Sequence, residues 1–551
     1  MKLRPYQLEA GDGIMREWET NVSTLVVLPT GLGKTVLFAD IIRRKFPRRA
    51  MVVAHREELI FQARDKIQAV TGLHAEIEMG ELRANMGGGL FGPPCRVVVS
   101  TVQTLTAGGD GSGRYTRFDP NHFGTLIIDE AHHATAGSYR KVIDWFTRNE
   151  SLRVLGVTAT PDRTDEEALG QVFGSVAYDF EIWDAIREGW LVPIEQQMVD
   201  VDGLDFSGVK TTLGDLNGAE LAAVMEREEI LHRIASPTIE ILGARRAIVF
   251  CSSVAHAERL AEIFNRHRSG MASWVCGETD KEDRRRMLAD FAGGKIQVIC
   301  NCGVLTEGFD DWGVEVIVMA RPTKSRALYA QMGGRGTRPP PGTVDGPETA
   351  AARRAAIAAS KKTHCLFLDF VAICGRHKLV SAADILGGNV SDDIVAEAVK
   401  KLKSAGKPVN VSEAIEEAQR EAKERAEAEA ATRARLTLKA TYKTRSVNPF
   451  DVLEIDPTVS RGWDKGRQLS PKQRDILLKQ GINPDGMEFH QAKQMLNEVF
   501  RRWDGNLCSY KQAALLKRYG INASSMSREQ AKATIDGLAA NGWRKPAEVA
   551  A

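Results

Sequence analysis

The first 380 residues alternate short apolar runs with amphipathic helical stretches, and this alternation restricts the chain to few architectures. Helix-like segments such as Lys34–Lys45 and Glu57–Val70 separate the runs. The runs are continuously apolar, which is typical of parallel strands covered on both faces. We therefore predict an α/β fold of two tandem, doubly wound parallel-sheet lobes, followed by an α-helical C-terminal region. The predicted strands are Thr24–Leu28, Ala50–Ala54, Arg96–Ser100, Thr125–Asp129 and Val154–Val157 in the first lobe, and Arg246–Cys251, Ser273–Cys276, Gln297–Cys300, Val314–Met319 and Cys365–Leu368 in the second.

The chain is 551 residues long, which is too long for a single hydrophobic core. Residues 200–245 are polar and then helical, as expected of a connector. Residues 339–362 begin with Pro-Pro-Pro-Gly and continue with Ala and Arg, which predicts an exposed insertion. The predicted parts are a first lobe at 1–198, a connector at 199–245, a second lobe at 246–385, a helical arm at 393–445 and a duplicated helical module at 461–545.

The C-terminal module contains an internal repeat and a concentration of positive charge. Eight positions recur at an offset of 39, which indicates a duplicated helix–turn–helix-like unit. Residues 461–545 carry 16 Lys or Arg against 8 Asp or Glu, a net charge of +8, whereas the whole chain carries +2. The repeated residues are Lys472, Gln473, Gly481–Asn483 and Gln491–Lys493, which recur as Lys511, Gln512, Gly520–Asn522 and Gln530–Lys532.

The segment from Pro29 to Thr35 follows a predicted strand and opens a predicted helix, as a P-loop does. In a P-loop, glycines let backbone N–H groups wrap phosphates, a Lys reaches the β- and γ-phosphates, and a hydroxyl ligates Mg²⁺. The helix N-terminus adds its dipole. The strict pattern fails at its first position, Leu28, so a structural turn is the alternative. The residues predicted to hold the nucleotide here are Thr30, Gly31, Gly33, Lys34 and Thr35.

Two adjacent carboxylates, Asp129 and Glu130, end a predicted strand 95 residues after Lys34. In P-loop enzymes the first such acid holds Mg²⁺ and the second polarises the attacking water. Ligands of open α/β sheets bind at this end of the strands. We therefore predict ATP and Mg²⁺ as cofactors, with Thr35 and Asp129 on the metal, and with Lys34, Asp129 and Glu130 as catalytic residues.

With both motifs in place, residues 1–380 resemble a DEAH-type superfamily 2 helicase, a family with two RecA-like lobes. Further motifs match in the family's order at 3–7, 54–59, 100–104, 158–161, 249–252, 305–310 and 331–338. The resemblance implies that Gln7 reads the adenine base and that Gly308 and Asp310 help to bind the nucleotide. It also implies roles in coupling hydrolysis to movement for His132, Thr158, Thr160 and Gln331. The nucleic-acid contacts that it implies are Arg56, Thr101, Gln103, Ser252 and Thr306.

The last of these motifs contains two arginines, Arg335 and Arg338, three residues apart. Phosphoryl transfer needs positive charge on the transferring oxygens, and an arginine finger contributes about 10³–10⁵ in rate. We predict that both arginines are catalytic and act across the interface between the lobes. Unaccompanied, such a Gly-rich stretch would more often be a surface loop.

Within the superfamily, the chain is most similar to RadD-like helicases and to type III restriction subunits, phage-encoded ones among them, which act on DNA. RadD-like proteins carry a cysteine zinc cluster after the arginine motif, but only Cys365 and Cys374 follow it here. Two cysteines cannot fill four tetrahedral positions, so we expect no zinc and place Cys365 in a buried strand. No recognisable nuclease motif is present in the sequence.

The predicted function is therefore an ATP-dependent DNA helicase or translocase in replication, recombination or repair. An RNA-dependent ATPase of the same superfamily, or an ATP-driven clamp whose C-terminal repeat docks a partner protein, is the alternative. Lys472, Lys511, Lys517 and Arg518 are the predicted DNA contacts of the basic module. The aromatic residues of this module stack on bases or, for most of them, fill its core. They are Trp463, Trp503, Tyr510, Tyr519 and Trp543.

The sequence also allows a prediction of the cellular compartment. No apolar run approaches the roughly 18 residues needed to cross a bilayer. The opening residues have no apolar signal region. The eight cysteines form no repeated C-x-x-C pair, which fits a reducing compartment. We therefore expect a cytoplasmic protein.

Overall fold

A computed structural model describes most of the chain. The described residues are 3–55, 57–87, 94–108, 113–159, 163–212, 214–306, 308–373, 379–387, 390–437, 449–453, 455, 457, 462–464, 466–540 and 543. Arg56, Thr160 and Cys374, which the sequence singled out, lie outside them. The chain divides into two compact units, one of Met1–Gly388 with Asp392–Ala422 and one of Asn389–Ser391 with Lys423–Ala551. None of the helices in the described part is long and apolar enough to cross a membrane.

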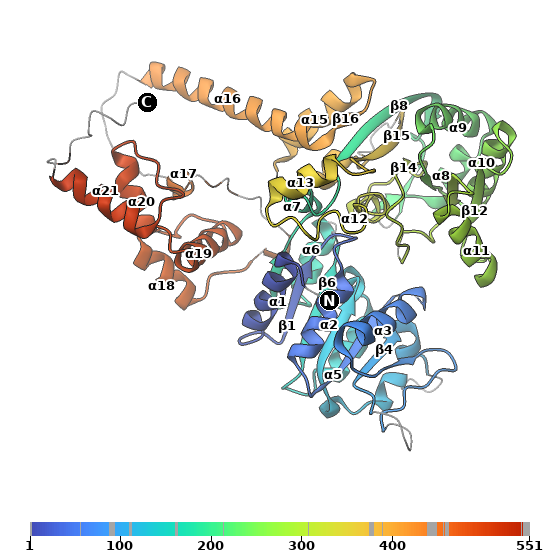
Figure 1. Cartoon of the computed structure of the whole chain (residues 1–551), viewed down its shortest axis with the longest axis horizontal. Coiled ribbons are helices and arrows are strands. Elements are labelled where there is room, and N and C mark those ends of the chain that lie inside the picture. The colour runs from blue at the N-terminus through green and yellow to red at the C-terminus, as the bar shows by residue number, and fades with distance from the viewer. Residues whose placement is uncertain are drawn as a thin grey trace. The chain divides into compact units, whose positions relative to one another are not determined.

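The first lobe of the larger unit is a seven-stranded, fully parallel sheet in the order β3-β4-β2-β5-β6-β1-β7. This lobe is drawn in blue to cyan in Figure 1. The five strands predicted from apolar runs are its five inner strands. The two edge strands, β3 and β7, were not predicted, because polar residues interrupt their apolar pattern. The strands are β1 (Ser23–Val27), β2 (Arg49–Ala54), β3 (Ala75–Glu78), β4 (Val97–Thr101), β5 (Phe123–Asp129), β6 (Arg153–Thr158) and β7 (Ser175–Asp179).

Most connections of the first lobe contain a helix, as parallel strands require, whereas the described residues between β3 and β4 form no helix. The first helix, α1, precedes the first strand and packs beside β7. The helices are α1 (Pro5–Glu17), α2 (Lys34–Arg44), α3 (Glu57–Thr71), α4 (Val102–Thr106), α5 (Gly137–Phe146), α6 (Arg163–Gly170) and α7 (Ile182–Arg187), with short 3₁₀ turns at η1 (Arg114–Arg117), η2 (Pro120–His122) and η3 (Ala131–Thr135).

The second lobe is another seven-stranded sheet, in the order β12-β13-β11-β14-β15-β8-β16, and it is parallel except for β16. The five strands predicted from the sequence are all present. Together the two lobes confirm the predicted fold class. The strands are β8 (Ile194–Asp205), β11 (Ala247–Phe250), β12 (Ala272–Val275), β13 (Val298–Asn301), β14 (Val316–Met319), β15 (Cys365–Ile373) and β16 (Val409–Asn410), beside a small β9 (Thr211–Thr212) and β10 (Asp215–Leu216) hairpin.

The structure draws the boundary between the lobes differently from the sequence. The expected boundary at 198/199 falls inside β8, and the whole of β8 pairs with β15 in the second sheet. The expected connector also joins the core of this lobe, because Leu221, Met225 and Leu231 pack in its buried cluster. The polar, interrupted pattern of β8 concealed this strand in the sequence. The helices of the second lobe are α8 (Gly218–Met225), α9 (Glu228–Leu242), α10 (Val254–His267), α11 (Lys281–Ala292), α12 (Arg326–Gly333), α13 (Ala350–Ala358) and α14 (Ala382–Leu386).

The region expected to be one helical arm is two helices, α15 (Asp392–Ala405) and α16 (Val411–Thr437). Between them, Gly406 takes a left-handed conformation and the edge strand β16 pairs with β8. Glycine tolerates this conformation without a steric penalty, so the helix stops here. Val411 and Ile415 of α16 are fully buried, so the start of this helix belongs to the core of the larger unit rather than to a solvated arm.

The C-terminal unit folds around its own hydrophobic core, which runs from Phe450 to Leu538. Each copy of the repeat contributes a pair of helices (Figure 1). The first helix of each pair begins in the same way. Ser470 and Ser509 both cap a helix by accepting a hydrogen bond from the N–H of a Gln three residues later. The helices of this unit are α17 (Pro449–Leu453), α18 (Pro471–Gln480), α19 (Phe489–Asp504), α20 (Tyr510–Arg518) and α21 (Arg528–Ala540), with a 3₁₀ turn η4 (Gly462–Asp464).

Candidate nucleotide-binding site

The P-loop connects β1 to α2 and has the backbone of a phosphate cradle. Gly31 and Gly33 are left-handed, with φ of 91° and 77°. A Cβ at Gly33 would lie 2.9 Å from Nε2 of Gln7, so no larger residue fits this turn without displacing its neighbours. Gly33 provides no side-chain cap for α2, which leaves the first N–H groups of that helix directed at the cradle.

The departure from the strict P-loop pattern at Leu28 has a structural explanation. Leu28 is fully buried, and its N–H donates to the carbonyl of Thr158 at 2.8 Å. This residue therefore extends the pairing of β1 with β6 and takes no part in the turn. The cradle begins at Thr30.

The paired acids lie at the end of β5, facing the P-loop. Nζ of Lys34 lies 2.7 Å from Oε1 of Glu130, and the two side chains are only 13% and 8% exposed. Glu130 has a positive φ of 48°, which is uncommon for a residue with a side chain. Asp129 accepts a hydrogen bond from the Glu130 N–H at 3.0 Å. The tight turn at Glu130 thus points the carboxylates of Asp129 and Glu130 in different directions.

The electrostatics of this pair are set by burial and by mutual attraction. Burial alone would lower the pKa of Lys34, but the charges of Glu130 and Asp129 raise it above its usual value. Burial would likewise raise the pKa of Glu130, but Lys34 and His132 hold it well below its usual range. Both groups are therefore charged at neutral pH. His132 also bonds Thr158 at 3.1 Å, which links the acidic turn to β6.

The base end of the site is built by the opening motif. Gln7 is buried, and its Nε2 donates to the carbonyl of Leu32 at 3.0 Å, inside the P-loop. The Tyr6 hydroxyl donates to the same carbonyl at 2.9 Å. The ring of Tyr6 stacks on Phe180 and meets Trp190 edge-on. The adenine-reading glutamine implied by the resemblance thus lies directly beside the phosphate cradle.

The two arginines of the last motif reach this site from the second lobe, after α12. The Arg335 guanidinium donates three hydrogen bonds, to the carbonyl of Thr306 at 3.1 and 2.6 Å and to that of Phe309 at 2.8 Å. Arg338 pairs with Asp310, and its side chain lies against Gly31 of the P-loop. Arg335 therefore holds the 306–309 loop, whereas Arg338 faces the phosphate cradle.

A cavity of about 860 Å³ joins these elements. Both lobes line it, and they also touch directly, because Nε2 of Gln62 donates to the carbonyl of Gly308 at 3.2 Å. The sequence-predicted residues that line it are Gln7, Thr30, Gly31, Gly33, Lys34, Thr35, Asp129, Glu130, Gly308, Asp310, Arg335 and Arg338.

One wall of the cavity comes from the stretch at 339–362, which the sequence predicted to be an exposed insertion. Arg4 pairs with Asp345 at 2.8 Å. The Arg353 guanidinium lies 3.8 Å from the ring centroid of Trp190, and Nε of Arg353 donates to the carbonyl of Glu188. Arg353 is almost fully buried. An arginine in an Ala-rich run gave no local signal for this role, because Trp190 and Glu188, the partners that place it at the cavity, lie more than 160 residues away.

These residues fit a magnesium nucleotide. The glycine cradle and Lys34 suit phosphates, and the cavity size suits a small-molecule ligand. Among the described residues, no three His, Cys, Asp or Glu side chains form a metal-ligand cluster. Nucleotide-bound Mg²⁺ usually takes only one or two protein carboxylates besides phosphates and water, so Thr35 and Asp129 suit it.

The predicted nucleic-acid contacts that lie among the described residues of the two lobes end a strand or follow its carboxyl end. Thr101 ends β4 and caps α4, and Gln103 is exposed on α4. Ser252 follows β11 and bonds His256 at 2.9 Å. Thr306 is buried beside Arg335. Gln331 is buried in α12, and Cys365 is buried in β15, where the sequence placed it.

In the C-terminal unit, the predicted contacts Lys472, Lys511, Lys517 and Arg518 are exposed. Lys517 donates to the carbonyl of Asp451. The aromatic residues divide between core and surface. Trp463 and Tyr510 are buried and Tyr519 packs against the core, whereas Trp503 and Trp543 are 40% and 45% exposed.

Comparisons with known proteins agree with the geometry. Residues 1–163 match the family described as type III restriction enzyme, res subunit, and residues 226–339 match the helicase conserved C-terminal domain. The chain is 30% identical to the putative ATP-dependent helicase IRC3 of Saccharomyces cerevisiae over 409 residues, 71% of this chain and 54% of that protein. It is 25% identical to the type I restriction enzyme EcoAI endonuclease subunit of Escherichia coli over 374 residues, 61% of this chain and 44% of that protein.

The fold recurs in a solved structure of the ATP-dependent type ISP restriction-modification enzyme LlaBIII bound to DNA. The similarity has a TM-score of 0.50 and 16% identity, and covers 98% of this chain and 40% of that one. The chain spans about half the length of the curated relatives it matches. Both family matches fall on the two lobes that build the cavity. The chain therefore belongs to the superfamily 2 helicases, with a first domain like that of restriction-enzyme motor subunits.

Proposed function

We propose that this chain is an ATP-dependent DNA translocase or helicase that couples ATP hydrolysis to movement of its two lobes along DNA. The observation that carries the proposal is the cavity that both lobes line. Lys34 and Glu130 come from one lobe, and Arg338 comes from the other. A site divided in this way is complete only when the lobes are close together, so each turnover is tied to opening and closing.

The residues take distinct roles in this proposal. The P-loop backbone and Lys34 bind the phosphates, and Mg²⁺ held by Thr35 and Asp129 would neutralise charge on their oxygens. Glu130 orients the attacking water by accepting its hydrogen bond. Arg338 stabilises the charge that develops on the transferring group, while Arg335 fixes the loop that carries Asp310.

The coupling route runs through one side-chain hydrogen bond between the turn after β5 and the end of β6. His132 follows the acidic turn and bonds Thr158 at the end of β6. The chain then continues directly into the 158–161 motif. A displacement at Glu130 is therefore transmitted to this motif by one side-chain contact, and we propose that His132 and Thr158 communicate the state of the nucleotide.

DNA is the proposed substrate because the first domain is similar to those of restriction enzymes, whose substrate is DNA. A role in replication, recombination or repair completes the proposal. The basic C-terminal module would add contacts. Lys472 and Lys511 lie in the first turns of α18 and α20. A cation there is unfavourable for the helix dipole, so helix stability does not explain these lysines.

The decisive experiment compares ATP hydrolysis with single-stranded DNA, duplex DNA and RNA, paired with strand displacement on both overhang types. We expect strong stimulation by DNA and weak stimulation by RNA. Glu130→Gln provides the inactive reference, because it keeps the site's shape but loses the carboxylate. Glu397→Gln on the surface of α15 is the matched control. Stimulation by RNA alone would reject the DNA assignment, and hydrolysis at the normal rate by Glu130→Gln would reject the role of that residue.

A further inference from the structure

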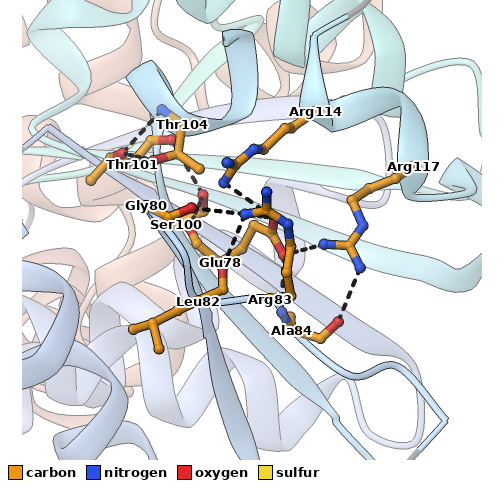
Figure 2. A network of polar contacts seen from close by, with 10 residues as sticks. All are labelled: Glu78, Gly80, Leu82, Arg83, Ala84, Ser100, Thr101, Thr104, Arg114 and Arg117. Atoms are coloured by element: carbon orange, nitrogen blue, oxygen red, sulfur yellow. Dashed lines mark hydrogen bonds and ion pairs between the residues drawn. The ribbon is translucent and has the colours of Figure 1, made fainter. Parts of the chain in front are cut away.

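A second concentration of charge lies at the far end of the first-lobe sheet from the P-loop. Glu78 ends the edge strand β3, and its side chain is fully buried. Three arginines that belong to none of the helicase motifs surround it. Figure 2 shows the guanidinium groups of Arg83, Arg114 and Arg117 gathered around this one carboxylate.

The three arginines are not equivalent. Arg117 is held closely, with Nη1 2.6 Å from Oε2 of Glu78. Arg83 and Arg114 approach Oε1 only to 3.7 Å, beyond hydrogen-bond distance. Nη1 of Arg114 is buried and has no hydrogen-bond acceptor. The Ala84 N–H donates to Oε2 of Glu78 at 2.9 Å, so the carboxylate is anchored by the backbone as well as by Arg117.

The cluster carries more positive than negative charge. In the part of the chain that the structure describes, all ion pairs of these three arginines go to Glu78. One carboxylate therefore faces three guanidinium groups, which leaves two positive charges uncompensated within the cluster. The side chains of Arg83, Arg114 and Arg117 are 47%, 25% and 39% exposed, so a ligand from solution can reach them.

The cluster lies close to Thr101, a predicted DNA contact, and this position favours a DNA phosphate as the anion that it binds. The hydroxyl of Ser100 donates to the Glu78 carbonyl at 2.7 Å, and the next residue is Thr101 of the 100–104 motif. The sheet is parallel, so Glu78 and Thr101 share its carboxyl edge with the P-loop. Five strand spacings separate β3 from β1, roughly 24 Å, which places the cluster well outside the nucleotide cavity.

We propose that Arg83 and Arg114 bind one backbone phosphate of the DNA strand that passes Thr101, with Glu78 and Arg117 positioning them. The inference rests on the proposed DNA-translocase function and extends it to residues outside the motifs. Guanidinium groups suit this ligand because they present paired N–H donors to phosphate oxygens. Glu78 offsets the repulsion between the arginines, and Nη1 of Arg83 donates to the carbonyl of Gly80 at 2.8 Å, which holds that guanidinium group in place.

The test is the affinity of the full-length protein for single-stranded DNA, measured by fluorescence anisotropy across a salt series. The variant is Arg83→Ala/Arg114→Ala. We expect affinity to fall about tenfold at low salt, and the slope of log affinity against log salt to become shallower by about 0.7, the value for one phosphate on a single strand. Arg83→Lys/Arg114→Lys retains the charge and should retain most of the slope. The DNA-independent ATPase rate should not change, and the DNA concentration for half-maximal stimulation should rise.

Arg43→Ala is the matched control. It removes one exposed arginine at the end of α2, at the opposite edge of the same sheet, and leaves Asp40 paired with Arg44. An affinity and slope for the double variant equal to those of this control would overturn the site while leaving the proposed function intact. Absence of DNA binding by the unmodified protein would instead reject the proposed function. Unfolding temperatures within about 2 °C of the unmodified protein would exclude a folding defect. A larger drop would move the measurement to Arg83→Ala alone, because this side chain is 47% exposed and approaches Glu78 only to 3.7 Å.

Discussion

Lys34 and Glu130 form an ion pair between the P-loop and the end of β5, with the ammonium nitrogen 2.7 Å from the carboxylate oxygen. The same ammonium group is the one that a P-loop directs at phosphates. In the proposed function, phosphate binding by Lys34 competes with the ion pair, so a nucleotide that takes the lysine would release Glu130 to meet a water molecule. Nucleotide binding and activation of Glu130 would then be linked through one side chain.

Lys34→Ala should abolish ATP hydrolysis and also destabilise the protein. The variant leaves the Glu130 carboxylate buried without its main cation, which costs about 1–3 kcal/mol. Lys34→Ala/Glu130→Gln should recover most of that stability without recovering hydrolysis. Urea unfolding of the two single variants and the double variant gives the coupling free energy. A coupling near zero would show that the ion pair does not stabilise the fold.

Arg335→Ala and Arg338→Ala should fail in different ways. Arg338→Ala should lower ATP turnover by about 10³-fold or more with little change in ATP affinity, because an arginine finger acts mainly in the transition state. Arg338→Lys should not restore turnover, since one ammonium cannot replace the planar fork. Arg335→Ala should also lower the unfolding temperature, because it breaks three hydrogen bonds to the 306–309 loop. Equal unfolding temperatures for the two alanine variants would contradict this division of roles.

Arg353→Ala should weaken ATP binding several-fold while leaving turnover at saturating ATP nearly unchanged. Arg353 packs on Trp190 and bonds the Glu188 carbonyl, so it supports the base end of the cavity without touching the phosphate end. The measurement is KM against kcat for ATP. Arg354→Ala, one residue away and exposed, is the control. A loss confined to kcat would place Arg353 in the chemistry instead.

Asp369→Asn should stabilise the protein at neutral pH but not in acid. Burial raises the pKa of Asp369 to about 6, although hydrogen bonds from Tyr329 and Gln196 oppose the shift. The folded protein thus holds this proton more tightly than the unfolded chain, whose Asp titrates near 3.9. The ionised carboxylate therefore disfavours folding above pH 6, and this cost disappears as the pH falls from about 6 to 4.

The expected gain from Asp369→Asn is on the order of 3 kcal/mol in the free energy of unfolding at pH 7 to 8. Asn can still accept the hydrogen bonds from Tyr329 and Gln196. Urea unfolding at pH 4, 6 and 8 measures the difference, with the exposed Asp393→Asn as control. A difference that does not vary with pH would assign the effect to packing rather than to ionisation.

The sequence predicted those parts of the fold and site that are encoded locally. The P-loop and Asp129 could be predicted because each follows or ends a continuously apolar strand. The strand and the functional residues are therefore adjacent in the sequence. The ion pair of Arg4 with Asp345 joins residues 341 apart, and the packing of Arg353 on Trp190 depends on how α13 folds back. No local pattern encodes such contacts. The strand β8 was missed because its residues are polar and its apolar pattern is interrupted, so it carries no local signal of a buried parallel strand.

The C-terminal unit has a hydrophobic core of its own, so it can be removed to test the role of the basic module. Its core includes Phe450 and Leu453, so a cut at residue 461 would divide that core, whereas a cut after Ala422 follows the boundary between the units. Residues 1–422 should therefore fold and hydrolyse ATP. Loss of the basic module should weaken DNA binding most at low salt and make the salt slope shallower by about 2–5 on duplex DNA.

Full-length Lys472→Ala/Lys511→Ala tests the same role without truncation. These two lysines occupy equivalent positions of the repeat and are both exposed, so replacing them removes charge without disturbing the core. We expect a slope shallower by about 1–2 on duplex DNA, because each lysine contacts at most one phosphate and each contact contributes about 0.9. Lys479→Ala, which removes an exposed lysine from the last turn of α18, is the control. Salt series for the truncated and full-length proteins that run parallel with equal intercepts would reject DNA binding by the module and favour its docking to a partner protein.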